Sequence, residues 1–219
     1  GTRPNLPTSE ASSFIAPFET LAGDDVFRGR KKELDQLRSY IGVLPPDSKL
    51  TRFRIWASDW VKPKGMPALS ISGPGGVGKS ALVARFILEH SRVIPEARLL
   101  FAYLDFDRSV LSVTEPETLL IEILNQLDLQ FQSEGYFHQL RQSFTEQMAT
   151  ERSRQGMAVS SHYSRVATVI AELMKLIEDS LGPRPFVIVL DTFEEVQYRG
   201  ESLAFPLWEM LDRMQQSFP

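Results

Sequence analysis

The clearest chemical signal in this 219-residue chain lies at residues 73–80, where Gly-Pro-Gly-Gly-Val-Gly-Lys-Ser ends in a lysine and a hydroxyl. Glycines let a backbone curl so that successive N–H groups point inward at an anion, and the positive end of a following helix adds to this field. The segment fits the G-x-x-x-x-G-K-[ST] pattern of a phosphate-binding loop. It predicts that Lys79 reaches the β- and γ-phosphates of a nucleoside triphosphate and that Ser80 is a Mg²⁺ ligand. The expected nucleotide contacts are Gly73, Pro74, Gly75, Gly76, Val77, Gly78, Lys79, Ser80 and Ala81.

A second signal is the apolar run Phe-Val-Ile-Val-Leu at residues 186–190, which ends in Asp191. After a phosphate-binding loop this pattern predicts a Walker B strand, because the carboxylate must emerge at the carboxyl end of a buried strand beside Mg²⁺. Asp191 would hold the metal through water. Glu194 is the candidate general base that polarises the attacking water, with Glu195 as the alternative. Both glutamates could instead cap the next helix or face solvent.

The elements that must position these groups alternate between strands and helices. Strands are predicted over 68–71, 99–106 and 186–190. Helices are predicted over roughly 30–43, from 78, from 114, within 134–160, over 166–177 and over 202–215. Thr114 and Glu117 fit a capping box at the start of one helix. Alternating strands and helices indicate an α/β fold with a parallel sheet and right-handed crossovers.

The composition narrows the class of protein. The formal net charge of −4 argues against a broad nucleic-acid surface, and the absence of cysteine excludes disulfides and thiolate metal sites. No apolar run approaches the about 20 residues of a membrane helix, and the N-terminus lacks a signal-peptide core. We therefore expect a cytoplasmic protein without a membrane role. Residues 1–23, rich in Pro, Ser and Thr, are expected to form a mostly irregular arm before a domain at 24–219.

A third segment, Val-Phe-Arg-Gly-Arg-Lys-Lys-Glu-Leu at 26–34, combines with the two motifs into a family resemblance. The chain resembles the STAND class of P-loop ATPases within the AAA-like group. Its members carry such a segment before the loop, and a D-x-F-E-E run like that at 191–195. By this resemblance Phe27 and Arg30 are candidate contacts to the adenine and ribose. One departure is Thr192, because many AAA-like proteins have the catalytic acid there, and this puts the hydrolysis rate in doubt.

The resemblance implies a three-layer α/β P-loop domain that binds ATP or ADP with Mg²⁺ and hydrolyses ATP slowly as a conformational switch. It also implies that a sensor strand follows Walker B, so the domain is expected to be truncated after the Walker B strand and its helix. Protein partners or self-assembly are expected. Two alternatives remain open: an AAA-like motor or loader acting on nucleic acid, and a nucleotide-binding interaction module with negligible turnover. The chain has no Asn/Thr-Lys-x-Asp guanine-reading motif, which favours ATP.

Overall fold

The computed structural model describes residues 9–25, 27–43, 68–91, 99–107, 111–132, 135–152, 159–182, 185–200 and 204–217. The chain separates into two compact units. The first comprises Gly1–Leu100 and Arg184–Val187, and the second comprises Phe101–Pro183 and Ile188–Pro219. Val26 and the aromatic segment 47–64 lie outside the described residues.

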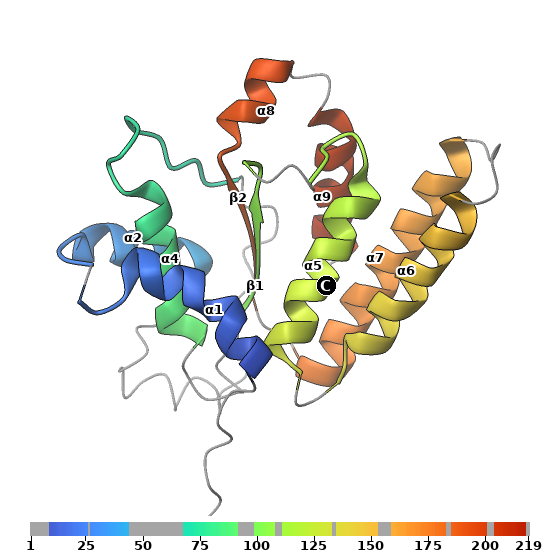
Figure 1. The fold of residues 1–219 in the computed structure, drawn as a ribbon, viewed down its shortest axis with the longest axis horizontal. Coiled ribbons are helices and arrows are strands. Elements are labelled where there is room, and N and C mark those ends of the chain that lie inside the picture. The colour runs from blue at the N-terminus through green and yellow to red at the C-terminus, as the bar shows by residue number, and fades with distance from the viewer. Residues whose placement is uncertain are drawn as a thin grey trace, which may run out of the picture. The chain divides into compact units, whose positions relative to one another are not determined.

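The first unit contains helices α1 (Ser9–Ala22), α2 (Lys31–Ile41) and α4 (Lys79–Ser91) (Figure 1). The irregular arm expected at the N-terminus is wrong for residues 9–22, which form α1 and pack against α4. Phe18 and Ala22 are buried four residues apart, so they share one face of the helix. Their burial outweighs Pro17 and the low helix propensity of the serines, since tertiary contacts override local preference.

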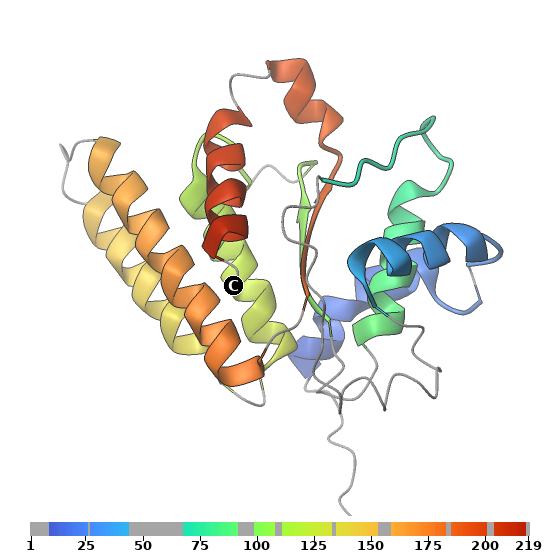
Figure 2. The same ribbon diagram turned by 180° about the vertical axis from the view of Figure 1, so that it is seen from behind.

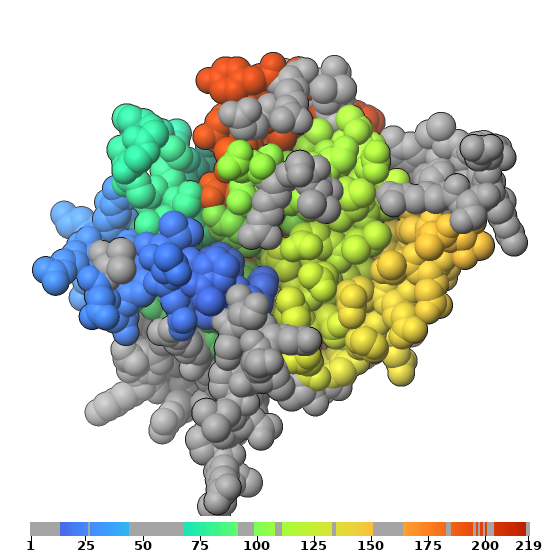
Figure 3. Space-filling view, viewed as in Figure 1, coloured from blue at the N-terminus to red at the C-terminus, as the bar shows by residue number. Residues whose placement is uncertain are grey.

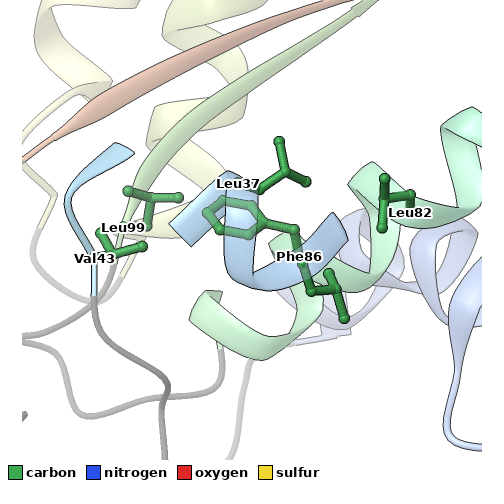
Figure 4. Close-up of a cluster of buried hydrophobic side chains, with 6 residues drawn as sticks. Leu37, Val43, Leu82, Phe86 and Leu99 are labelled. Atoms are coloured by element: carbon green, nitrogen blue, oxygen red, sulfur yellow. The ribbon is translucent and has the colours of Figure 1, made fainter. Parts of the chain in front are cut away.

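A hydrophobic cluster joins α2 and α4 beneath the phosphate-binding loop. Its buried members are Leu34, Leu37, Val43, Leu82, Phe86 and Leu99. Figure 4 shows Phe86 of α4 lying against Leu37 of α2, as the predicted stripes on the two helices require. The partly buried Phe27 and Ile71 pack on the same cluster, so the segment around Phe27 and the residues just before the loop are anchored to one core.

The second unit contains most of a two-stranded parallel sheet and five helices among its described residues. The strands are β1 (Leu100–Asp105) and β2 (Phe186–Asp191). The helices are α5 (Pro116–Gln130), α6 (His138–Arg152), α7 (Val159–Leu181), α8 (Glu194–Arg199) and α9 (Phe205–Ser217). Helix α7 packs against both α6 and α9, and Figure 2 shows α6 and α7 side by side. The predicted strands at 99–106 and 186–190 and the helix at 166–177 are confirmed.

Two glutamines of α5 form hydrogen bonds with the backbone N–H and carbonyl groups on the edge of β1 that faces away from β2. The Gln126 side chain accepts a hydrogen bond from the Tyr103 N–H at 2.7 Å and donates one to the Tyr103 carbonyl at 2.8 Å. Gln130 pairs in the same way with Phe101, at 3.3 and 2.7 Å. Four residues of helix rise about 6 Å and two residues of strand about 6.6 Å, so the two spacings match. The amides thus replace a neighbouring strand and close this edge of the sheet.

Two predictions about local structure are wrong. Residues 68–71, predicted as a strand, adopt no regular secondary structure, and Leu69 is 48% exposed. A strand requires a hydrogen-bonding neighbour, and the sheet in the described part of the chain pairs β1 with β2 alone. The capping box at Thr114 and Glu117 does not form, because Glu115 is the N-cap and makes no side-chain cap bond. The Thr114 hydroxyl lies 2.9 Å from that of Ser112 instead.

Candidate nucleotide-binding site

The phosphate-binding loop of the first unit has the backbone that its glycines predict. Gly76 and Gly78 have φ angles of 76° and 81°, a left-handed conformation that side-chain-bearing residues rarely adopt. Helix α4 begins directly after them at Lys79, so the N–H groups of its first turn have no partner within the helix. The loop side chains from Gly73 to Val77 are exposed, and Figure 3 shows this segment at the surface. An exposed turn of backbone donors ahead of a helix N-terminus fits a polyphosphate.

The Lys79 ammonium group lies over this loop. Its Nζ donates hydrogen bonds to the carbonyl oxygens of Gly73 at 3.0 Å and of Pro74 at 3.4 Å. Both bonds are exposed, so they are exchangeable for stronger charge-assisted bonds to phosphate oxygens. Ser80 and Ala81 occupy the first turn of α4 and are half-buried. Lys79 is therefore held at the loop by weak contacts that a nucleotide would replace.

Arg30 contacts the same loop from a distant part of the sequence. Its guanidinium donates to the carbonyl oxygen of Val77, and a second bond joins Nη1 to the Gly78 oxygen at 3.3 Å. The Arg30 backbone is left-handed, with φ 55° and ψ 29°, at the position that precedes α2. The structure thus brings this predicted nucleotide contact to the loop itself. A direct contact of Arg30 with adenine or ribose stays a prediction.

Phe27 packs on the hydrophobic cluster and lies under a cation. The guanidinium carbon of Arg85 is 5.8 Å from the centre of the Phe27 ring, within the range of a cation–π contact. Arg85 also pairs with Asp24 at 2.5 Å and with Glu89 at 2.8 Å. The hydrogen bond that Arg85 donates to Asp24 is the main cause that raises the pKa of Arg85 above its ordinary value, with Glu89 adding to it. This arrangement fixes the ring, whose contact with a nucleotide also stays a prediction.

In the second unit, Asp191 lies at the carboxyl end of β2, as its sequence position predicts. Its Oδ1 accepts a hydrogen bond from the Thr192 N–H at 3.0 Å, and its Oδ2 accepts one from the Tyr103 hydroxyl. Thr192 has a left-handed backbone, with φ 56°, and its hydroxyl donates to Oδ1 of Asp105 at 3.2 Å. The carboxylates at the ends of the two parallel strands are therefore linked through Thr192. A carboxylate held in this way fits an outer ligand of Mg²⁺.

A comparison with protein-family models shows the family to which this chain belongs. The model of the AAA ATPase domain matches residues 60–219, which include the phosphate-binding loop and the strand ending in Asp191. This chain belongs to the AAA ATPase domain family. Members of this family typically bind ATP or ADP with Mg²⁺. The match begins after residues 24–34, so the Phe27 and Arg30 segment lies outside it. No curated protein and no solved structure matches the chain significantly.

Glu194, the candidate general base of this AAA ATPase domain, is the first residue of the short helix α8 and is exposed. The residue before it is held in place, because the Phe193 ring packs between Phe106 and Trp208 at centroid distances of 5.6 and 5.3 Å. An acidic residue at a helix start is also stabilised by the helix dipole, so both roles considered for Glu194 fit its position. The Glu195 side chain lies outside the described residues.

Tyr103 was not singled out from the sequence as a partner of Asp191. The signal was present, because residues two apart on a strand share a face and β1 ends at Asp105. The structure brings Tyr103, Asp105 and Thr192 together around Asp191, and brings Arg30 together with the Lys79 loop. Lys79 and Asp191 belong to different units. Within the described ranges no helix has the length and apolar character to cross a membrane.

Proposed function

We propose that this AAA ATPase domain binds Mg·ATP through residues 73–80 and hydrolyses it slowly as a nucleotide-dependent signalling or assembly switch. The observation that carries the proposal is the left-handed glycine loop that opens onto α4 with Lys79 and Arg30 both bound to it. Phosphate oxygens would accept hydrogen bonds from the loop N–H groups and from the Lys79 ammonium. The narrower STAND class, with protein partners or self-assembly, rests on the resemblance of segments 26–34 and 191–195.

The proposed division of labour follows the residues. The Ser80 hydroxyl, and Asp191 through water, would hold Mg²⁺, which would supply charge neutralisation for the phosphates when bound. Lys79 stabilises the charge that develops on the γ-phosphate. Glu194 accepts the proton of the attacking water. Slow turnover is expected because position 192 carries a threonine hydroxyl where many AAA-like proteins have a carboxylate.

The second candidate is an interaction module that binds nucleotide with negligible turnover. The specific observation in its favour is that the Thr192 hydroxyl is bound to Asp105, so this position is engaged in a structural contact. The nucleic-acid motor has weaker support, because the net charge of −4 does not attract phosphate backbones. The two favoured candidates share the binding step and differ in the release of phosphate.

The test begins with the nucleotide that the protein carries. Purified protein is denatured, the released nucleotide is identified by ion-exchange chromatography, and single-turnover phosphate release is then measured with Mg·ATP. Released ADP or ATP together with slow phosphate release supports the switch, whereas retained nucleotide without phosphate release supports the interaction module. Failure to bind either Mg·ATP or Mg·ADP in a direct titration would refute both.

A further inference from the structure

The Asp191 carboxylate is held in the second unit by two different donors. The Thr192 N–H bonds to Oδ1 at 3.0 Å, and the Tyr103 hydroxyl bonds to Oδ2. The first bond comes from the adjacent residue and moves with the Asp191 backbone. The second comes from a neighbouring strand 88 residues away in sequence, so it fixes the carboxylate relative to the sheet. Two donors on separate oxygens determine the plane in which the carboxylate lies.

Tyr103 is itself anchored on the side opposite β2. Gln126 of α5 bonds both the N–H and the carbonyl of Tyr103, at 2.7 and 2.8 Å. The Gln126 amide donates a further bond to Glu122 at 2.7 Å, which fixes its orientation, and Gln126 is only 3% exposed. A chain of bonds therefore runs from α5 through β1 to the carboxylate at the end of β2. These bonds hold Tyr103 in position when Asp191 gains or loses a ligand.

We infer that Tyr103 is a positioning residue for Asp191, orienting the carboxylate so that its remaining lone pairs meet water bound to the Mg²⁺ of a Mg·nucleotide complex. This inference rests on the proposed function, in which Asp191 holds Mg²⁺ through water. Loss of a partner that orients a metal-binding side chain typically lowers metal affinity by about 10- to 100-fold. A purely structural Tyr103 would affect the stability of the sheet and leave Mg²⁺ dependence unchanged. The two roles therefore differ in a measurable quantity.

The test uses Tyr103→Phe, which removes one oxygen atom and keeps the ring. ATP affinity is measured by titration calorimetry with excess Mg²⁺ and with EDTA, and the ratio of the two affinities gives the Mg²⁺-dependent gain. Both titrations use one preparation, so an inactive fraction cancels in the ratio. We expect Tyr103→Phe to lower this gain about 10-fold and to leave the affinity in EDTA unchanged. Tyr198→Phe, at a side chain that is 85% exposed, is the matched control and should change neither value.

A double-mutant cycle sharpens the result. If Tyr103 acts through Asp191, then Tyr103→Phe has no further effect on the gain in an Asp191→Asn background. An equal loss in both backgrounds, or an unchanged gain in Tyr103→Phe alone, would overturn the inference. Wild-type protein that binds ATP equally with and without Mg²⁺ would also overturn it while leaving nucleotide binding intact. Wild-type protein that binds no ATP would refute the proposed function itself, and the inference with it.

Discussion

The phosphate-binding loop of the first unit and the strand ends of the second unit hold their charged groups by opposite means. In the loop, the cationic side chains of Lys79 and Arg30 donate to backbone carbonyl oxygens. At the strand ends, the carboxylates of Asp105 and Asp191 accept from side chains and backbone N–H groups. The first arrangement is exposed and depends on long, rotatable side chains. The second is half-buried and depends on short side chains fixed to a sheet.

The difference teaches how each region can respond to a nucleotide. Long cationic side chains on an exposed loop change partners at low cost, so the loop suits a group that must exchange carbonyl contacts for phosphate. The network at the strand ends cannot rearrange without breaking bonds to the sheet, so it suits a fixed ligand. Each region also keeps one non-glycine residue in left-handed backbone, Arg30 and Thr192. This conformation costs about 1–2 kcal/mol, and it persists where surrounding contacts determine it.

The largest expected effect is on turnover. If Glu194 positions the attacking water, Glu194→Gln should keep Mg·ATP bound and slow phosphate release by about 10²-fold or more. Single-turnover phosphate release measures this, and Glu172→Gln, at an exposed position on α7, is the control. Equal rates in wild type and Glu194→Gln would assign the general base to Glu195 or to a group outside this chain. The strand ends would then supply the metal ligand Asp191 but not the base.

The anchored character of the strand ends is tested by Gln126→Ala. This substitution leaves a partly buried N–H and carbonyl of Tyr103 without their Gln126 partner, so we expect the free energy of unfolding to fall by about 1–3 kcal/mol. Urea denaturation followed by circular dichroism measures the change. Gln142→Ala, at an exposed position on α6, is the matched control and should change stability little. A loss no larger than that of the control would show that the α5 amides do not support β1.

The role of the loop cation is tested by Lys79→Ala. Removing a charge-assisted phosphate contact should cost about 1.5–3 kcal/mol of binding free energy, or roughly 10- to 150-fold in Mg·ATP affinity. The fold should stay intact, because the Lys79 ammonium donates to exposed carbonyl oxygens of the loop. Lys175→Ala, on the exposed face of α7, is the control. Unchanged affinity in the titration would remove the phosphate-binding role from this loop.

The smallest effect is expected from Arg30→Ala. It removes the bonds to the Val77 and Gly78 carbonyls, and we expect Mg·ATP affinity to fall by about 5-fold, near 1 kcal/mol, because the contact is partly exposed. The neighbouring exposed Arg28→Ala should have no effect. A loss as large as that of Lys79→Ala would point to direct nucleotide contact by Arg30. An unchanged affinity would mean that Arg30 stabilises the loop only when no nucleotide is bound.

Local patterns predicted the elements that depend on short-range rules. The apolar stripe of 166–177 predicted a helix because burial of one face follows from 3.6-residue periodicity, and the run at 186–190 predicted a buried strand for a similar reason. The stretch at 68–71 has the same strand-like residues but forms no strand, since strand formation depends on a neighbour. Residues 9–22 show the reverse case, because contact with α4 makes a helix from a segment without a clear signal.

The sequence by itself determined the glycine loop, the helix that follows it and the acidic end of β2, because each depends on the types and spacing of nearby residues. Tertiary structure alone decided that Arg30 bonds the loop 47 residues away and that Tyr103 reaches Asp191 across 88 residues. It also decided that Gln126 and Gln130 take the place of a strand beside β1. These contacts depend on which backbone edges and carbonyls remain without partners after folding, and that information is not contained in any local pattern.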